Sequence, residues 1–161
     1  MSLRELAAQS KHKRRSTLKR SRRKGFRAER QLVRKLRDYG FKSVRVPVSA
    51  TRSERLPDVF ATRGGTLLAF EVKAYHAERA YFPKKEVGKL FAFLDLFDMY
   101  DCKHAVLAGK FPYKWVFKSV DRPDDYVLLK EEDSNIEFVH EKKEETEDES
   151  ELEKRSLGLN S

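Results

Sequence analysis

The sequence predicts an α/β domain in which helices flank a central mixed β-sheet. Three features of the 161 residues lead to this fold class. A helical pattern over 25–39 comes first, two apolar segments joined by a glycine turn follow over 58–74, and a second helical pattern at 84–100 precedes further apolar strands. Helices that alternate with strands in this way are typical of layered α/β folds. The chain length favours one domain with tails.

The first helix is expected over 25-GFRAERQLVRKLRDY-39 and ends at Gly40. Its apolar residues recur at helical spacing: Phe26, Leu32, Val33 and Leu36. Glu29 falls on the same stripe, so a carboxylate is predicted on the face that meets the sheet. Alone, a glutamate at the edge of a stripe is more often solvated.

The central strands follow this helix. A short strand is expected at 41–48, a polar loop at 49–56, and then a hairpin with strands near 58–62 and 66–74. The hairpin turns at 63-RGG-65, because glycine supplies the positive φ that tight turns require.

The second half of the domain begins with a helix at 84–100. Strands at 104–110 and 113–120 and a short apolar run at 126–129 complete the predicted order α-β-β-β-α-β-β. The helix is apolar on more than one side, which favours a partner surface, although a thin sheet that covers both sides would explain it equally simply.

Charge divides the chain into three parts. Residues 1–23 are predicted to form a basic disordered arm, residues 24–130 a basic folded domain, and residues 131–161 an acidic, disordered tail. The net charge of +9 suggests a polyanionic partner such as nucleic acid. The arm is either solvated or adds non-specific phosphate contacts.

Other bulk features bound the class of protein. The single cysteine, Cys102, forms no internal disulfide, which fits a reducing cytoplasm. No apolar run approaches membrane-spanning length.

Three charges in the hairpin indicate chemistry. Side chains alternate along a strand, so Glu71 and Lys73 share one face, and Asp58 on the partner strand lies at a similar distance from the turn as Glu71. Two converging carboxylates suit Mg²⁺, which binds oxygen ligands and keeps several waters. A nearby lysine can orient or help deprotonate an attacking water and offset charge on a phosphorane.

The spacing is Pro57-Asp58, twelve residues, then Glu71-Val72-Lys73. This is the signature of PD-(D/E)xK nucleases, and by itself it is weak. The chain more specifically resembles the archaeal Holliday junction resolvases of that superfamily, through 24-KGFRAERQLVRKLRDYGFKSVRVPVS-49, 57-PDVFATRGG-65, 69-AFEVKA-74, 81-YFPKKEVGKLFAF-93 and 105-AVLAGKF-111. The resemblance covers residues 24–120 and implies a restriction-endonuclease-like core, with 24–130 as the nuclease domain.

The resemblance also implies roles for individual residues. Catalysis would use Glu29, Asp58, Glu71 and Lys73. Mg²⁺, with Mn²⁺ as a substitute, would bind the three carboxylates and the backbone carbonyl of Val72. Branched DNA would be contacted by Arg30, Arg45, Ser49, Arg52 and Arg55. The stretch 84-KKEVGKL-90 lacks the glutamine that many superfamily members carry there.

The resemblance favours a homodimer in which Phe93 and Phe97 lie at the interface. A four-way junction has near-twofold symmetry, so two linked active sites could make two symmetric nicks. The expected function is resolution of four-way (Holliday) DNA junctions in recombination and repair, at the nucleoid. The alternatives are another PD-(D/E)xK nuclease that acts on flaps or duplex DNA, and a non-catalytic basic DNA-binding protein.

Overall fold

The computed structural model describes residues 3–47 and 56–138, with side chains of the first helix described from Lys11 onward except His12. Its elements, in chain order, are α1 (Leu3–Asp38), β1 (Lys42–Arg45), β2 (Val59–Arg63), β3 (Thr66–Ala74), β4 (Arg79–Phe82), α2 (Lys84–Leu94), β5 (Cys102–Phe111), β6 (Lys114–Val120) and β7 (Tyr126–Leu129). Within these ranges no helix is long and apolar enough to cross a membrane.

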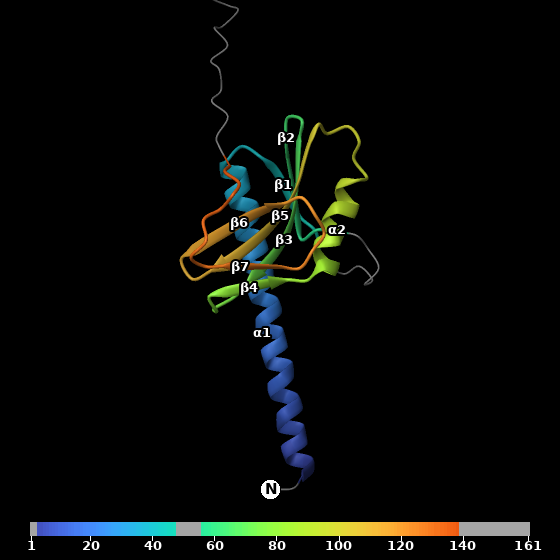
Figure 1. Ribbon diagram of the computed structural model, residues 1–161. Helices are drawn as coiled ribbons and strands as arrows, with labels where there is room; N and C mark the ends of the chain where they lie inside the picture. The colour runs from blue at the N-terminus through green and yellow to red at the C-terminus, as the bar shows by residue number, and fades with distance from the viewer. Residues whose placement is uncertain (1–2, 48–55, 139–161) are drawn as a thin grey trace, which may run out of the picture.

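The main sheet has the strand order β1-β2-β3-β5-β6, and β4 and β7 form a separate two-stranded sheet. The β3–β5 pair is parallel and the other pairs of the main sheet are antiparallel, so the sheet is mixed as predicted. The parallel pair requires a crossover, which α2 supplies. Figure 1 shows α1 and α2 on opposite sides of this sheet.

Side-chain alternation along β3 builds two separate cores. Leu67 and Ala69 pack into the core that contains α2, whereas Leu68, Phe70 and Val72 pack into the core that contains α1. This confirms the predicted division of faces. It places Glu71 and Lys73 on the α2 side of the sheet, at the end of β3 away from the hairpin turn.

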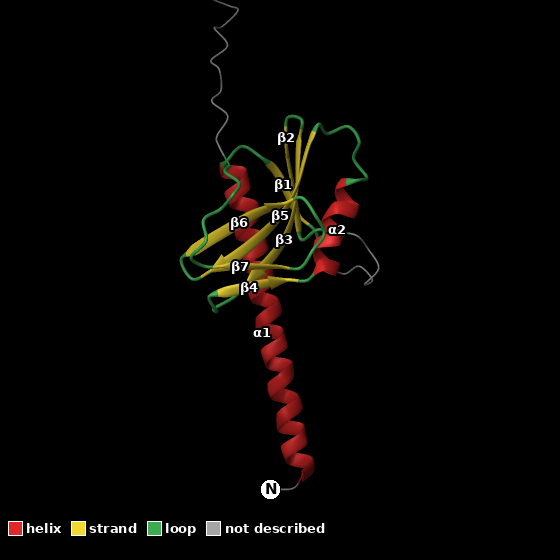
Figure 2. Cartoon of the chain, viewed as in Figure 1, coloured by secondary structure: helices red, strands yellow, loops and turns green. Residues whose placement is uncertain are grey.

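The first helix is much longer than predicted. Helix α1 begins at Leu3, so the described part of the predicted disordered arm is helical and projects away from the body (Figure 2). Residues 3–24 contain neither proline nor glycine and are rich in Ala, Leu, Gln, Lys and Arg, which are strong helix formers. The absence of an apolar stripe hid this continuation from a periodicity argument.

The second helix is shorter than predicted and ends at Leu94 rather than residue 100. Phe97 and Tyr100 still pack against the core from the following turns, so their spacing imitates a helix. Phe93, one of the two aromatic residues expected at an interface, lies in the core of the single chain. Its side chain is 5% exposed, and its ring centroid lies 5.5 Å from that of Phe60 and 5.1 Å from that of Phe97.

The packed body continues beyond residue 130, where the acidic tail was predicted to begin. The ring of Phe138 contacts those of Tyr39, Phe41, Phe70 and Phe117 at centroid distances of 5.1–6.1 Å. Ser134 and Asn135 accept hydrogen bonds from β6 backbone amides. Residues 131–138 therefore close the α1 side of the sheet.

Strand β4 was also missed, because its four residues are too few to establish an alternation.

Candidate active site

Asp58 lies at the entrance of β2 and is held there by its own backbone and side chain. Its N–H donates to the Phe70 carbonyl at 2.9 Å, and its carboxylate accepts a hydrogen bond from the Val72 N–H at 2.8 Å. Since Val59 pairs with Phe70, the register sets Asp58 opposite Glu71. The hairpin thus brings two carboxylates together, as the sequence predicted.

Glu71 and Lys73 lie next to each other on the α2 side of β3. Glu71 is 8% exposed, and its Oε1 lies 3.7 Å from the Nζ of Lys73. A third carboxylate reaches the lysine from α2: Glu86 Oε2 lies 2.5 Å from Lys73 Nζ. That oxygen of Glu86 is buried. Among the described residues it accepts no hydrogen bond of good geometry, and its polar contact is the ion pair with Lys73.

The crowding of these groups shifts their pKa values. Burial raises the pKa of Asp58 to about 6; the hydrogen bond from Val72 offsets part of that effect and the charge of Glu29 adds to it. Burial likewise raises the pKa of Glu71 to about 8, and the neighbouring charge of Asp58 adds to the shift. Burial lowers the pKa of Lys73, but the ion pair with Glu86 and the charge of Glu71 outweigh that effect, so the pKa is raised. Lys73 is therefore a stable cation.

Glu29 approaches the same site from α1. It is 7% exposed, its Oε2 accepts a hydrogen bond from Arg45 Nε at 2.5 Å, and its charge acts on Asp58. The Arg45 guanidinium also lies over the Phe26 ring at 4.5 Å. The structure thus places Glu29 beside Asp58 but pairs it with Arg45, one of the predicted DNA-binding residues.

Of the remaining predicted DNA-binding residues, the structure describes Arg30 alone. Arg30 is exposed on α1, one residue after Glu29. Ser49, Arg52 and Arg55 fall outside the described residues.

The carboxylate pair fits a hard divalent cation. Among the described residues no three Asp, Glu, His or Cys side chains converge as a complete ligand set. Mg²⁺ does not need one, because it is commonly bound by one or two carboxylates and keeps its other ligands as water. Asp58 and Glu71 supply such a pair, and their raised pKa values show that two negative charges are costly there without a cation.

Glu86 is the site residue that sequence reasoning missed. It occupies the region where many superfamily members carry glutamine, and it lies four and seven residues before Leu90 and Phe93, both buried. A glutamate on the apolar stripe was the available signal, the same one that identified Glu29. At the start of α2, the Lys84 N–H donates a hydrogen bond to the Asp125 carboxylate at 2.8 Å.

Together, a mixed sheet between two helices and a carboxylate pair with a lysine on its central hairpin define a nuclease of the restriction-endonuclease-like fold. Residues 20–147 match the sequence model of the family described as archaeal Holliday junction resolvase (hjc). The chain belongs to this family, and hence to the Holliday junction resolvases.

Individual relatives agree. The chain is 43% identical over 93 residues to the crossover junction endodeoxyribonuclease Hje of Sulfolobus acidocaldarius and 35% identical over 104 residues to that of Saccharolobus solfataricus; these matches span 56% and 65% of this chain and 66% and 77% of the relatives. The solved structure of Archaeoglobus fulgidus Hjc, a Holliday junction resolvase, superposes with a TM-score of 0.55 at 29% identity, over 65% of this chain and 88% of that one.

The raised carboxyl pKa values predict how pH changes the stability of the metal-free protein. Folded Asp58 and Glu71 titrate near pH 6 and pH 8, above their unfolded values of 3.8 and 4.5. The folded state holds more protons between those values, so the free energy of unfolding falls as pH rises from about 4 to 8. We expect the melting temperature in EDTA to fall by several degrees over this range. Glu71→Gln should flatten most of the fall, and an equal slope in that variant would contradict the assignment.

The contact between Glu86 and Lys73 predicts a positioning role. Glu86→Gln removes the charge 2.5 Å from the lysine and should slow DNA cleavage about tenfold, because Lys73 is then free to turn towards Glu71. Single-turnover rates at saturating enzyme measure the effect. The matched control is Glu78→Gln, which removes the charge of an exposed glutamate that pairs with Lys130 rather than with Lys73. Equal rates for both variants would show that Glu86 does not position the lysine.

Proposed function

We propose that the chain cuts four-way DNA junctions by Mg²⁺-dependent hydrolysis at the site of Asp58, Glu71 and Lys73. The observation that carries this proposal is the pair of carboxylates, Asp58 half-buried and Glu71 buried, beside a lysine that is itself held as a cation. Asp58 and Glu71, with the Val72 carbonyl, would hold the ion, and Glu29 would assist from the Asp58 side. When bound, Mg²⁺ supplies Lewis-acid stabilisation of the phosphate and makes a coordinated water more acidic. Mn²⁺ would substitute.

The role of Lys73 follows from its charge. A lysine whose pKa is raised is a poor general base, so we assign it an electrostatic role. From the α2 side it would orient the attacking water and stabilise negative charge that develops on the phosphoryl oxygens. The ion pair with Glu86 would hold the Lys73 ammonium group in one position beside the site.

Contacts to the DNA backbone would surround this centre. Arg30, which is exposed beside Glu29, would bind phosphate directly, and Ser49, Arg52 and Arg55 would present the scissile strand. Arg45 would first hold Glu29 in place. Backbone contacts of this kind position the substrate and carry no base sequence, which suits an enzyme that selects branched DNA by shape.

Asp58→Asn tests the assignment of the metal site. The carboxamide preserves size but removes one charge from the pair, so junction cleavage should fall by at least about a thousandfold. Binding to a synthetic four-way junction should remain within about threefold of wild type. Mg²⁺ should raise the melting temperature of the wild-type protein and not of Asp58→Asn. Residual cutting by the variant at near wild-type rates would overturn the assignment.

We further propose that two copies associate through the end of α2. Leu96 and Met99 are 70% and 79% exposed, and Phe97 is half-buried between them. Adjacent apolar side chains of this kind favour a partner surface. Since Phe93 fills the core of a single chain, Phe97 is the predicted interface aromatic that remains available. A twofold dimer would present two sites for paired symmetric nicks.

Two aspartates at this surface test the dimer. Leu96→Asp combined with Met99→Asp should convert a dimer to a monomer at micromolar concentration, as measured by sedimentation equilibrium, because two charges become desolvated at the interface. The control, Tyr113→Asp, changes a fully exposed aromatic residue in the β5–β6 turn. If the control dissociates and the double variant does not, the surface is wrongly placed.

A further inference from the structure

A cleft adjoins the active site on the side of α1. It encloses about 610 Å³ between Arg20, Ser21, Lys24 and Gly25 of α1 and residues 72–76 at the end of β3. Lys73 lines this cleft and also contacts Glu71, so the cleft meets the candidate catalytic centre at this residue. Its described ionisable lining is Arg20, Lys24, Lys73, Tyr75 and His76, with no carboxylate among the lining residues that the structure describes.

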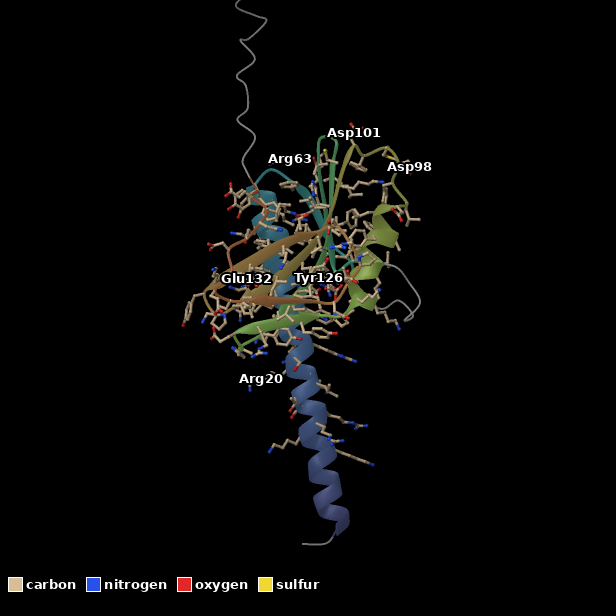
Figure 3. All side chains as sticks on the ribbon, in the orientation of Figure 1. Arg20, Arg63, Asp98, Asp101, Tyr126 and Glu132 are labelled. Carbon is tan, nitrogen blue, oxygen red and sulfur yellow. The ribbon has the colours of Figure 1, made fainter. Side chains whose placement is uncertain are left out.

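The cations of this cleft continue along α1. Residues 11–24 contain nine Lys or Arg and no Asp or Glu. The described side chains from Lys13 to Arg23 are exposed, and Figure 3 shows side chains extending from the projecting part of α1 into solvent, Arg20 among them. From Lys24 to Lys11 the helix rises about 20 Å. That is roughly six base pairs of duplex DNA. Residues 3–19 lie outside the stretch that matches the resolvase family.

This segment carries charges that repel one another. Like charges recur four residues apart at Lys11/Arg15, Arg15/Lys19, Lys19/Arg23 and Arg20/Lys24. Such pairs destabilise a helix, and the segment has no apolar stripe with which to pack on the body. At the cleft, slight burial and the charge of Arg20 lower the pKa of Lys24. A polyanion laid along the helix would relieve this repulsion.

We infer that the cleft and residues 11–24 of α1 form a phosphodiester-binding track that holds one DNA strand where it leaves the active site. The inference rests on the proposed function, because the track begins at Lys73. Arg20 and Lys24 contact the phosphates next to the scissile one, and the more distant cations follow the backbone of that arm. Tyr75, which is 39% exposed, also lines the cleft.

Salt dependence of junction binding tests the track. In the Asp58→Asn background, which binds without cutting, Arg20→Gln/Lys24→Gln should lower the slope of log K against log salt by about 2 and weaken binding on the order of tenfold at moderate salt. The matched control, Lys103→Gln/Arg122→Gln, removes two exposed charges at the other end of the sheet and should leave the slope unchanged. Equal slope changes in the two variants overturn the inference.

Neutral methylphosphonate linkages locate the contact. Placed singly at the three phosphates on either side of the cut, one or two of them should weaken binding of the protein with an intact cleft. The same linkages should have no further effect on Arg20→Gln/Lys24→Gln, since the two changes remove the same interaction. Additive losses at every linkage would show that the cleft does not bind these phosphates.

The same measurements separate this inference from the proposed function. A wild-type protein that cuts junctions while both charge variants retain its salt slope leaves the function intact and removes the track. A protein that fails to cut junctions in Mg²⁺ or Mn²⁺, yet shows the slope change, removes the proposed function and leaves the cleft and residues 11–24 as a DNA-binding surface.

Discussion

The structure depends on one electrostatic constraint, which is the burial of adjacent carboxylates at the end of a central strand. Asp58 and Glu71 face each other because the β2–β3 register leaves no other arrangement. Their separation from water raises both pKa values, so each ionised form requires compensation from nearby groups. The Val72 amide and Lys73 supply part of that compensation, whereas Glu86 adds a third negative charge and pairs with Lys73.

The sheet topology determines which helix can contribute to this centre. The parallel β3–β5 pair places the crossover helix α2 on the Glu71 side, where its first turn delivers Glu86 to Lys73. Helix α1 covers the other face and reaches the site from the Asp58 side, where Arg45 holds Glu29. Both helical layers thus contribute to the active site. A change in the packing of either helix should alter the positions of the carboxylates.

The sequence predicted the parts of this arrangement that follow from short-range periodicity. Alternation in 66–74 was enough to assign Glu71 and Lys73 to one face, and helical spacing placed Glu29 towards the sheet. It could not predict Glu86, because the contact with Lys73 depends on how α2 crosses the sheet. Phe138 was missed because one aromatic residue among acids carries no period, although it packs on four other rings.

Charge balance links the active site to the long helix. Around the centre, Glu29, Asp58, Glu71 and Glu86 face two cations, Arg45 and Lys73, so full ionisation leaves two negative charges. One divalent cation, such as the proposed Mg²⁺, would neutralise that excess without needing a closed cage of protein ligands. An active site with no net charge does not attract DNA electrostatically. The positive charge that attracts the DNA backbone must therefore lie outside the active site. Helix α1 contributes both to the charge of the active site and to the attraction of DNA, because Glu29 and the nine cations of residues 11–24 belong to one continuous helix.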